Sequence, residues 1–181
     1  MKKLVFGLGA LVCFSGITAL FFATPRAEAQ SGKRAPNQKA AAFEVRFWNW
    51  LSHADYRHWA APEGENANDF YPGQSPHGAF LKTHLNRIAA SSAKELPVGS
   101  IIVKENFTKD KKLKVITVMY KTKGYDPEHK DWWYAKYMPN GKVAMMKMKN
   151  SDKAMKLAGK VKGCIMCHEN ADGDDFAYFN D

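Results

Sequence analysis

The chain has 181 residues, 45% of them hydrophobic, and a formal net charge of +9. A basic protein can bind nucleic acid, anionic membranes or an acidic protein partner. The lysines are scattered along the sequence rather than gathered into a stripe, which argues against a nucleic-acid-binding surface and favours an ordinary solvated one.

The first 29 residues have the pattern of a signal peptide. Lys2 and Lys3 precede an apolar run over residues 4–23, Pro25 ends any helix there, and Ala27-Glu28-Ala29 is a small-x-small cleavage site. We therefore predict export to the periplasm and a mature start at Gln30. The alternative is an uncleaved N-terminal membrane anchor, because the apolar run approaches the ~20 residues that span a bilayer.

Removal of the leader changes the charge and the cysteine count. The net charge falls from +9 to +7, because three cationic residues and one anionic residue are lost. Cys13 is also removed, which leaves only Cys164 and Cys167 in the mature chain. In an oxidising compartment such a close pair forms a disulfide unless another reaction consumes the thiols.

Residues 30–41 form a predicted flexible lead-in, and residues 42–181 suit one domain. We expect helices over 41–51 and 55–59, the second capped by Asp55, a helical patch over 87–94, and a late helix over 151–162 capped by Ser151. Residues 139–141 have the composition of a hairpin turn. Strands are predicted over 79–86, 100–105, 113–120, 131–138 and 142–148. This order predicts an α+β fold, mainly an antiparallel β-sheet with flanking helices, in which a C-terminal helix or loop carries the cysteines.

Cys164-Ile165-Met166-Cys167-His168 matches C-x-x-C-H, the attachment motif for haem c. Two thiols three residues apart on a helical turn face the same way and can both add to the porphyrin vinyl groups. The adjacent His168 is then carried under the iron as the proximal ligand. The motif predicts one covalent haem c held by Cys164, Cys167 and His168. The alternatives are a C-x-x-C redox disulfide and part of a zinc site.

The second axial ligand decides what such a haem can do. A methionine sulfur would make a low-spin electron carrier, whereas a position without a protein ligand would admit small molecules. Methionines on strands are more often part of the core. The candidates are Met119, Met138, Met145, Met146, Met148 and Met155.

Several stretches share the order and spacing of one known family. They are Asp55-Tyr56-Arg57-His58-Trp59, Ser75-Pro76-His77-Gly78 with the strand that follows it, Pro97 to Glu105, Asp131-Trp132-Trp133-Tyr134, and Cys164 to His168 followed by Asp174-Asp175-Phe176. Together they resemble the cytochrome P-460 and cytochrome c′-beta family over roughly residues 42–180. The resemblance implies a small, largely β-sheet haem protein and a homodimer.

The resemblance also implies a role for Lys104. Cytochrome P-460 members oxidise hydroxylamine and nitric oxide, and a lysine nitrogen in them is bonded to the porphyrin; Lys104 matches that lysine. Burial against an apolar face would keep its amine neutral, as such a bond requires. On a strand, Lys104 shares a face with Ile102 and Ser100. The alternative is an ordinary surface lysine on a half-exposed strand.

The chain also departs from the cross-linked members. They carry an arginine on the preceding strand, where this sequence has Leu81. An apolar distal face resembles the cytochrome c′-beta branch, in which phenylalanine crowds the iron and nitric oxide binds without turnover. The candidates for that crowding are Phe70, Phe80 and Phe107, and those for proton transfer are His77 and His84.

Three functions are therefore expected, in this order. The first is oxidation of hydroxylamine or nitric oxide, with Lys104 tuning the haem. The second is binding of nitric oxide without turnover, and the third is simple electron transfer. Each implies a small nitrogen-containing ligand, a redox partner protein, or both.

Overall fold

The computed structural model describes residues 41–92, 95–148, 152–171 and 175–178. The predicted signal peptide and nearly all of the predicted lead-in lie outside these residues. Within them, no helix has both the length and the apolar character needed to cross a membrane.

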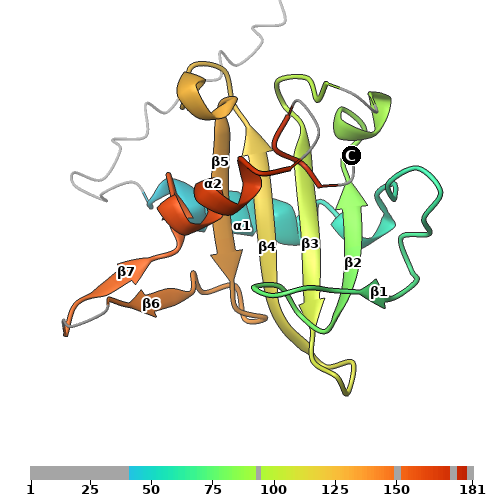
Figure 1. Ribbon diagram of the computed structural model, residues 1–181, viewed down its shortest axis with the longest axis horizontal. Coiled ribbons are helices and arrows are strands. Elements are labelled where there is room, and N and C mark those ends of the chain that lie inside the picture. Colours follow the sequence, from blue (N-terminus) through green and yellow to red (C-terminus); the bar gives the residue numbers. More distant parts are fainter. Residues whose placement is uncertain (1–40, 93–94, 149–151, 172–174, 179–181) are drawn as a thin grey trace, which may run out of the picture. The chain divides into compact units, whose positions relative to one another are not determined.

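A six-stranded antiparallel sheet forms the centre of the fold, in the order β1-β2-β3-β4-β5-β8. Figure 1 shows β2, β3, β4 and β5 side by side. The sheet, with helices on its two sides, confirms the predicted α+β class. The strands are β1 (Tyr71–Pro72), β2 (Phe80–Leu85), β3 (Ile101–Phe107), β4 (Leu113–Lys121), β5 (Trp132–Tyr137) and β8 (Ala158–Gly159).

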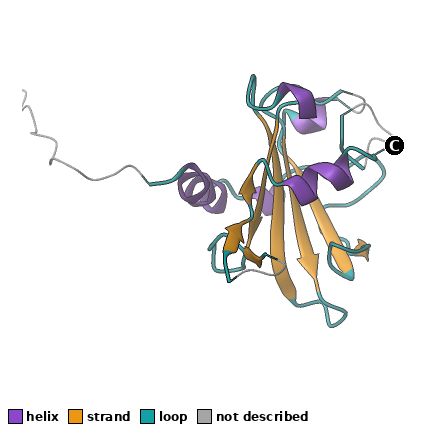
Figure 2. Ribbon diagram, turned by 60° about the vertical axis from the view of Figure 1, so that its left-hand side comes forward, coloured by secondary structure: helices purple, strands orange, loops and turns teal. Residues whose placement is uncertain are grey.

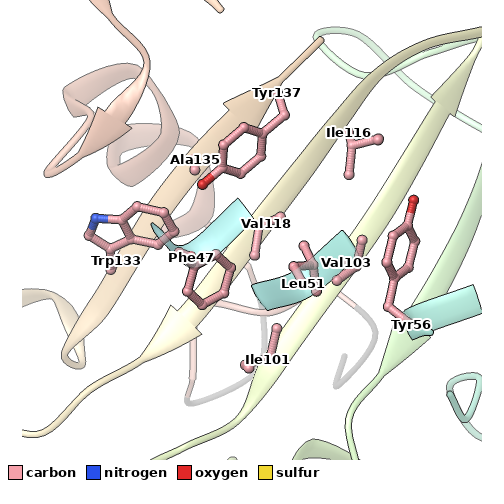
Figure 3. Packing of buried hydrophobic residues seen from close by; sticks show 10 residues of the cluster. All are labelled: Phe47, Leu51, Tyr56, Ile101, Val103, Ile116, Val118, Trp133, Ala135 and Tyr137. Atoms are coloured by element: carbon pink, nitrogen blue, oxygen red, sulfur yellow. The ribbon is translucent and has the colours of Figure 1, made fainter. Parts of the chain in front are cut away.

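Helix α1 (Phe43–His53) packs on one face of this sheet. Its buried Phe47 and Leu51 contact a cluster that includes Val103 and Val118 (Figure 3). Because side chains alternate along a strand, every second residue of β3 and β4 joins this layer. We call this side of the sheet the α1 face.

The α1 face also holds a buried carboxylate. Glu105 Oε1 accepts hydrogen bonds from Tyr56 Oη at 2.9 Å and Arg57 Nε at 2.8 Å. His84 Nε2 lies 3.5 Å from the other carboxylate oxygen. We call these four residues the Glu105 cluster.

The opposite face is covered by helix α2 (Lys162–His168), and Figure 2 shows helices on both sides of the sheet. Ile102, Met119 and Tyr134 from three adjacent strands pack here with Val161 and Ile165. We call this side the α2 face. Helix α2, on this side, carries Cys164, Cys167 and His168.

The predicted helix over 151–162 is wrong for the residues that the structure describes. Strand β7 (Ala154–Lys156) pairs with β6 (Met145–Lys147) in a separate two-stranded sheet, and β8 pairs with the edge of β5. Leu157 completes the edge, since its carbonyl accepts from Lys136 N at 2.9 Å. The unpaired groups of an edge strand need partners, and this requirement overrides the helical periodicity of the segment.

Three smaller predictions also need correction. Asp55 does not cap the 3₁₀ helix Tyr56–His58 with its side chain; its backbone is left-handed and its carboxylate pairs with His58. The turn at residues 139–141 is confirmed, but only Val143 bridges back to Tyr137 before the chain leaves for β6. The helical patch over 87–94 is reduced to a 3₁₀ turn at Ala89–Ser91.

Candidate haem site

A cavity of about 240 Å³ lies between the α2 face of the sheet and helix α2. Strands β3, β4 and β5 form its floor, and α2 and the segments beside it form its walls. Its lining is mainly apolar, and none of the described lining residues is an aspartate or a glutamate. The polar side chains that line it are His77, Lys104, Thr117, Tyr134, Lys136, Cys164, Cys167, His168 and Tyr178.

Helix α2 brings Cys164, Cys167 and His168 to this one cavity. Both cysteines are free thiols, and burial raises the pKa of Cys164, so the structure does not support the redox-disulfide alternative. Zinc also lacks support, because the described residues contain no group of three or more His, Cys, Asp or Glu placed to hold a metal ion. The arrangement leaves two free thiols at the same cavity as one imidazole.

The protonation of His168 is fixed by its surroundings. Its Nδ1 lies 2.8 Å from the carbonyl oxygen of Phe176, which can only accept, so Nδ1 carries the proton. Burial lowers the pKa of His168, which keeps the ring neutral. Nε2 is therefore the unprotonated nitrogen available to a metal.

A buried ion pair holds the segment that supplies this carbonyl. Asp175 accepts hydrogen bonds from Lys121 Nζ on β4 and from the backbone N–H of Leu96. The carbonyl of Asp175 also accepts from Trp132 Nε1 at 2.8 Å. Phe176 follows directly, so the acceptor for His168 is attached to the sheet through Asp175.

Lys104 projects from β3 into the same cavity and is half-buried. Burial lowers the pKa of its amine and outweighs the opposing effect of Glu65. The strand alternation anticipated this placement, since Ile102 lines the cavity beside Lys104. Lys104 is thus a partly desolvated amine in the cavity that the cysteines also line, rather than an ordinary surface lysine.

His77 lines the cavity from the loop before β2, and Asn106 orients its ring. Asn106 Oδ1 lies 2.8 Å from His77 Nδ1, while Asn106 Nδ2 donates to the carbonyl of Lys104 at 2.7 Å and to Thr117 Oγ1 at 3.1 Å. Because Asn106 Nδ2 already donates to these two oxygen atoms, the atom facing His77 is Oδ1, which accepts a hydrogen bond from His77 Nδ1. Burial, with nearby Lys104, lowers the pKa of His77 to about 4, so Nε2 is unprotonated at neutral pH.

Several other sequence candidates lie outside the cavity. His84 belongs to the Glu105 cluster on the α1 face. Phe70, Phe80 and Phe107 contact one another and do not line the cavity, so the expectation that they crowd the iron is not supported. Leu81 pairs with Asn106 and is buried, but it too is not a lining residue.

The methionine candidates are reduced to two. Met119 and Met146 line the cavity, whereas Met138, Met145, Met148 and Met155 do not. Met119 is buried within the core cluster of the α2 face, and Met146 is 45% exposed on the β6–β7 hairpin.

Sequence reasoning missed the contribution of Asn106. Asparagine is depleted in strand interiors, and Asn106 is a fully buried one, two residues from Lys104. An asparagine directly after a β-branched run, two residues from Lys104, is the sequence signal that could have indicated a side chain serving the site.

The lining residues fit a covalently held haem. Two thiols and one neutral imidazole lie on a single short helix at the wall of a largely apolar cavity. A porphyrin needs such apolar walls, and its iron needs an unprotonated imidazole nitrogen.

Comparison with known proteins agrees with this geometry. No curated protein matches the chain. The family model described as Cytochrome P460 matches residues 53–179, which include every strand of the sheet, helix α2 and the cavity. The chain therefore belongs to the Cytochrome P460 family.

Proposed function

We propose that this chain is an exported cytochrome with one covalent haem c that oxidises hydroxylamine or nitric oxide. One observation carries the proposal: the desolvated amine of Lys104 lines the same cavity as Cys164, Cys167 and His168. A lysine buried beside that motif distinguishes this site from a plain haem attachment site.

The residues would divide the work as follows. Cys164 and Cys167 would hold the haem through thioether bonds, and His168 Nε2 would bind its iron. The haem would bind the nitrogen compound and carry its electrons away. Lys104, whose neutral form burial favours, would bond to the macrocycle as in the cross-linked members of the family. The nitrogen would replace a ring hydrogen; two protons would be released, and two electrons would pass to the redox partner. Unprotonated His77 Nε2 would accept a proton inside the cavity.

A second candidate function is nitric oxide binding without turnover. It is favoured by the absence of any carboxylate among the described residues that line the cavity. A cavity with few proton acceptors can bind a neutral diatomic ligand, but it handles the protons of hydroxylamine less readily.

The test combines peptide mass spectrometry with a visible spectrum and a turnover assay. We expect the Lys104 peptide to carry the haem together with Cys164 and Cys167, the reduced spectrum to be strongly red-shifted, and hydroxylamine to be oxidised. Lys104→Met should abolish both the linkage and the red shift, whereas the exposed control Lys114→Met should change neither. Haem present with Lys104 free and no turnover would leave nitric oxide binding as the function, and absence of haem would overturn both.

Location and assembly complete the proposal. A basic protein released at Gln30 would work in the periplasm, as a homodimer that passes electrons to a redox partner. N-terminal sequencing of the exported protein should find Gln30 first, and an intact leader in the membrane fraction would indicate an anchor instead. Sedimentation velocity should give twice the mass of the mature chain.

A further inference from the structure

We infer that His77 is the second axial ligand of the haem iron, so that the resting protein has bis-histidine ligation. The inference rests on the haem attachment in the proposed function, and it does not depend on hydroxylamine oxidation. It assigns the coordination position that the sequence left open between methionine and no protein ligand.

The separation of the two imidazoles carries the argument. The ring centroids of His77 and His168 lie 6.4 Å apart, with an interplanar angle of 81°. A metal–imidazole bond is about 2.0 Å long, and an imidazole nitrogen lies about 1.2 Å from its ring centroid. Two imidazoles on opposite sides of one metal ion would therefore have centroids roughly 6–6.5 Å apart. The observed distance falls in this range, and both rings line the same cavity.

The two imidazole rings also have the same hydrogen-bonding arrangement. His168 donates from Nδ1 to the carbonyl of Phe176, and His77 donates from Nδ1 to Asn106 Oδ1, both at 2.8 Å. Each ring thus keeps Nε2 as its unprotonated nitrogen. Metal-bound histidines usually donate their other ring nitrogen to an acceptor that fixes tautomer and orientation.

The loop that carries His77 is held tightly against β3. Gly78 N donates to Asn106 Oδ1 at 3.2 Å. A Cβ at position 78 would lie 2.5 Å from the carbonyl oxygen of Phe107 and 2.6 Å from its nitrogen, so only glycine allows this approach without a backbone shift. One strand therefore fixes both the loop and the ring.

The competing ligands are less well placed. Met119 is part of the packed core, and Met146 is 45% exposed on the β6–β7 hairpin. Burial lowers the pKa of Lys104, which favours its neutral form, but the proposed function assigns this amine to the macrocycle. Among the described lining residues, His77 is the only imidazole besides His168.

Bis-histidine ligation has a consequence for the proposed function. A small ligand would have to displace His77 from the iron. The apparent affinity for that ligand would therefore be reduced in proportion to the fraction of molecules in which the position is open. The displaced Nε2 would then remain in the cavity as a proton acceptor. Ligation would make His77 a control on access to the iron.

The experiment is magnetic circular dichroism and electron paramagnetic resonance of the ferric protein, wild type and His77→Ala, after mass spectrometry has confirmed the haem. We expect the wild type to be low-spin, with a near-infrared band at the energy typical of two histidine ligands. This part of the test needs no variant. His77→Ala should be high-spin, should return to low-spin on addition of imidazole, and should bind carbon monoxide in the ferrous state at least about tenfold more tightly. The control His58→Ala, an exposed histidine, should match the wild type.

Three outcomes would overturn the inference. A high-spin wild type would mean that no protein group binds opposite His168, and it would leave the proposed function intact. A near-infrared band typical of methionine or amine ligation would assign another residue. A low-spin spectrum that His77→Ala leaves unchanged would do the same. Loss of the haem itself would instead refute the proposed function.

Discussion

The buried Asp175 is the position at which a single substitution should most affect the C-terminal part of the site. Its side chain is 1% exposed and accepts hydrogen bonds from Lys121 Nζ and Leu96 N, while its partner lysine is only 10% exposed. Asp175→Ala removes both acceptors at once. The ammonium of Lys121 would then lie in the interior with only the carbonyl of Leu96, 2.8 Å away, as an acceptor.

The expected cost follows from these contacts. Breaking a buried ion pair on one side costs about 3–5 kcal/mol, and an unpaired buried N–H costs about 1–3 kcal/mol. Both penalties arise from the loss of the same carboxylate, so they are not additive. We therefore expect the free energy of unfolding to fall by about 3–5 kcal/mol. Replacing both partners, as in Lys121→Met with Asp175→Leu, should cost less than Asp175→Ala alone, because no charge is left unpaired.

Urea denaturation of the haem-loaded protein, followed by far-ultraviolet circular dichroism, measures this difference. The exposed Glu63→Gln serves as a control and should change the free energy by less than about 0.5 kcal/mol. Because the pair is buried, the loss should persist in high salt. A change below about 1 kcal/mol for Asp175→Ala would refute the reasoning, since that is the range of an exposed pair.

Three further results are expected. Gly78→Ala should destabilise the fold by about 1–3 kcal/mol in urea denaturation and should displace His77, which the haem spectrum would report; an unchanged spectrum would contradict the close approach to Phe107. Leu51→Ala, at a fully buried position on the α1 face, should cost about 2–5 kcal/mol and leave the haem spectrum unchanged. Burial raises the pKa of Glu105, but its hydrogen bonds hold it below the usual 4.5. Its stabilising effect is therefore present above about pH 4.5 and lost as pH falls through the folded pKa, so Glu105→Gln should flatten the acid limb of a pH–stability curve.

The sequence predicted those features that depend on local pattern. The β-branched runs around Val103 and Val118 indicated strands because alternation and side-chain shape are properties of a few neighbouring residues. The same alternation placed Lys104 beside Ile102 on one face. The cysteine motif likewise needs only one helical turn, and α2 supplies it.

The features that the sequence did not predict depend on distant pairings. Asn106 meets His77 because β2 and β3 are antiparallel, and Asp175 meets Lys121 across 54 residues. Within the segment 154–159, β7 pairs with β6 and β8 pairs with the open edge of β5, and no local window of sequence reveals either partner. Each error or omission arises where a tertiary partner, rather than local propensity, decides the conformation.

Side chains alternate along β3, so its even-numbered residues face the cavity and its odd-numbered residues face the core under α1. Ile102, Lys104 and Asn106 face α2 and the cavity, whereas Val103 and Glu105 face α1 and its core. Because a sheet side chain reaches only its own layer, substitutions at the even positions should act first on the haem. Substitutions at the odd positions should act first on stability. A strand that serves two layers can therefore vary the residues beside the cavity without rebuilding the core behind it.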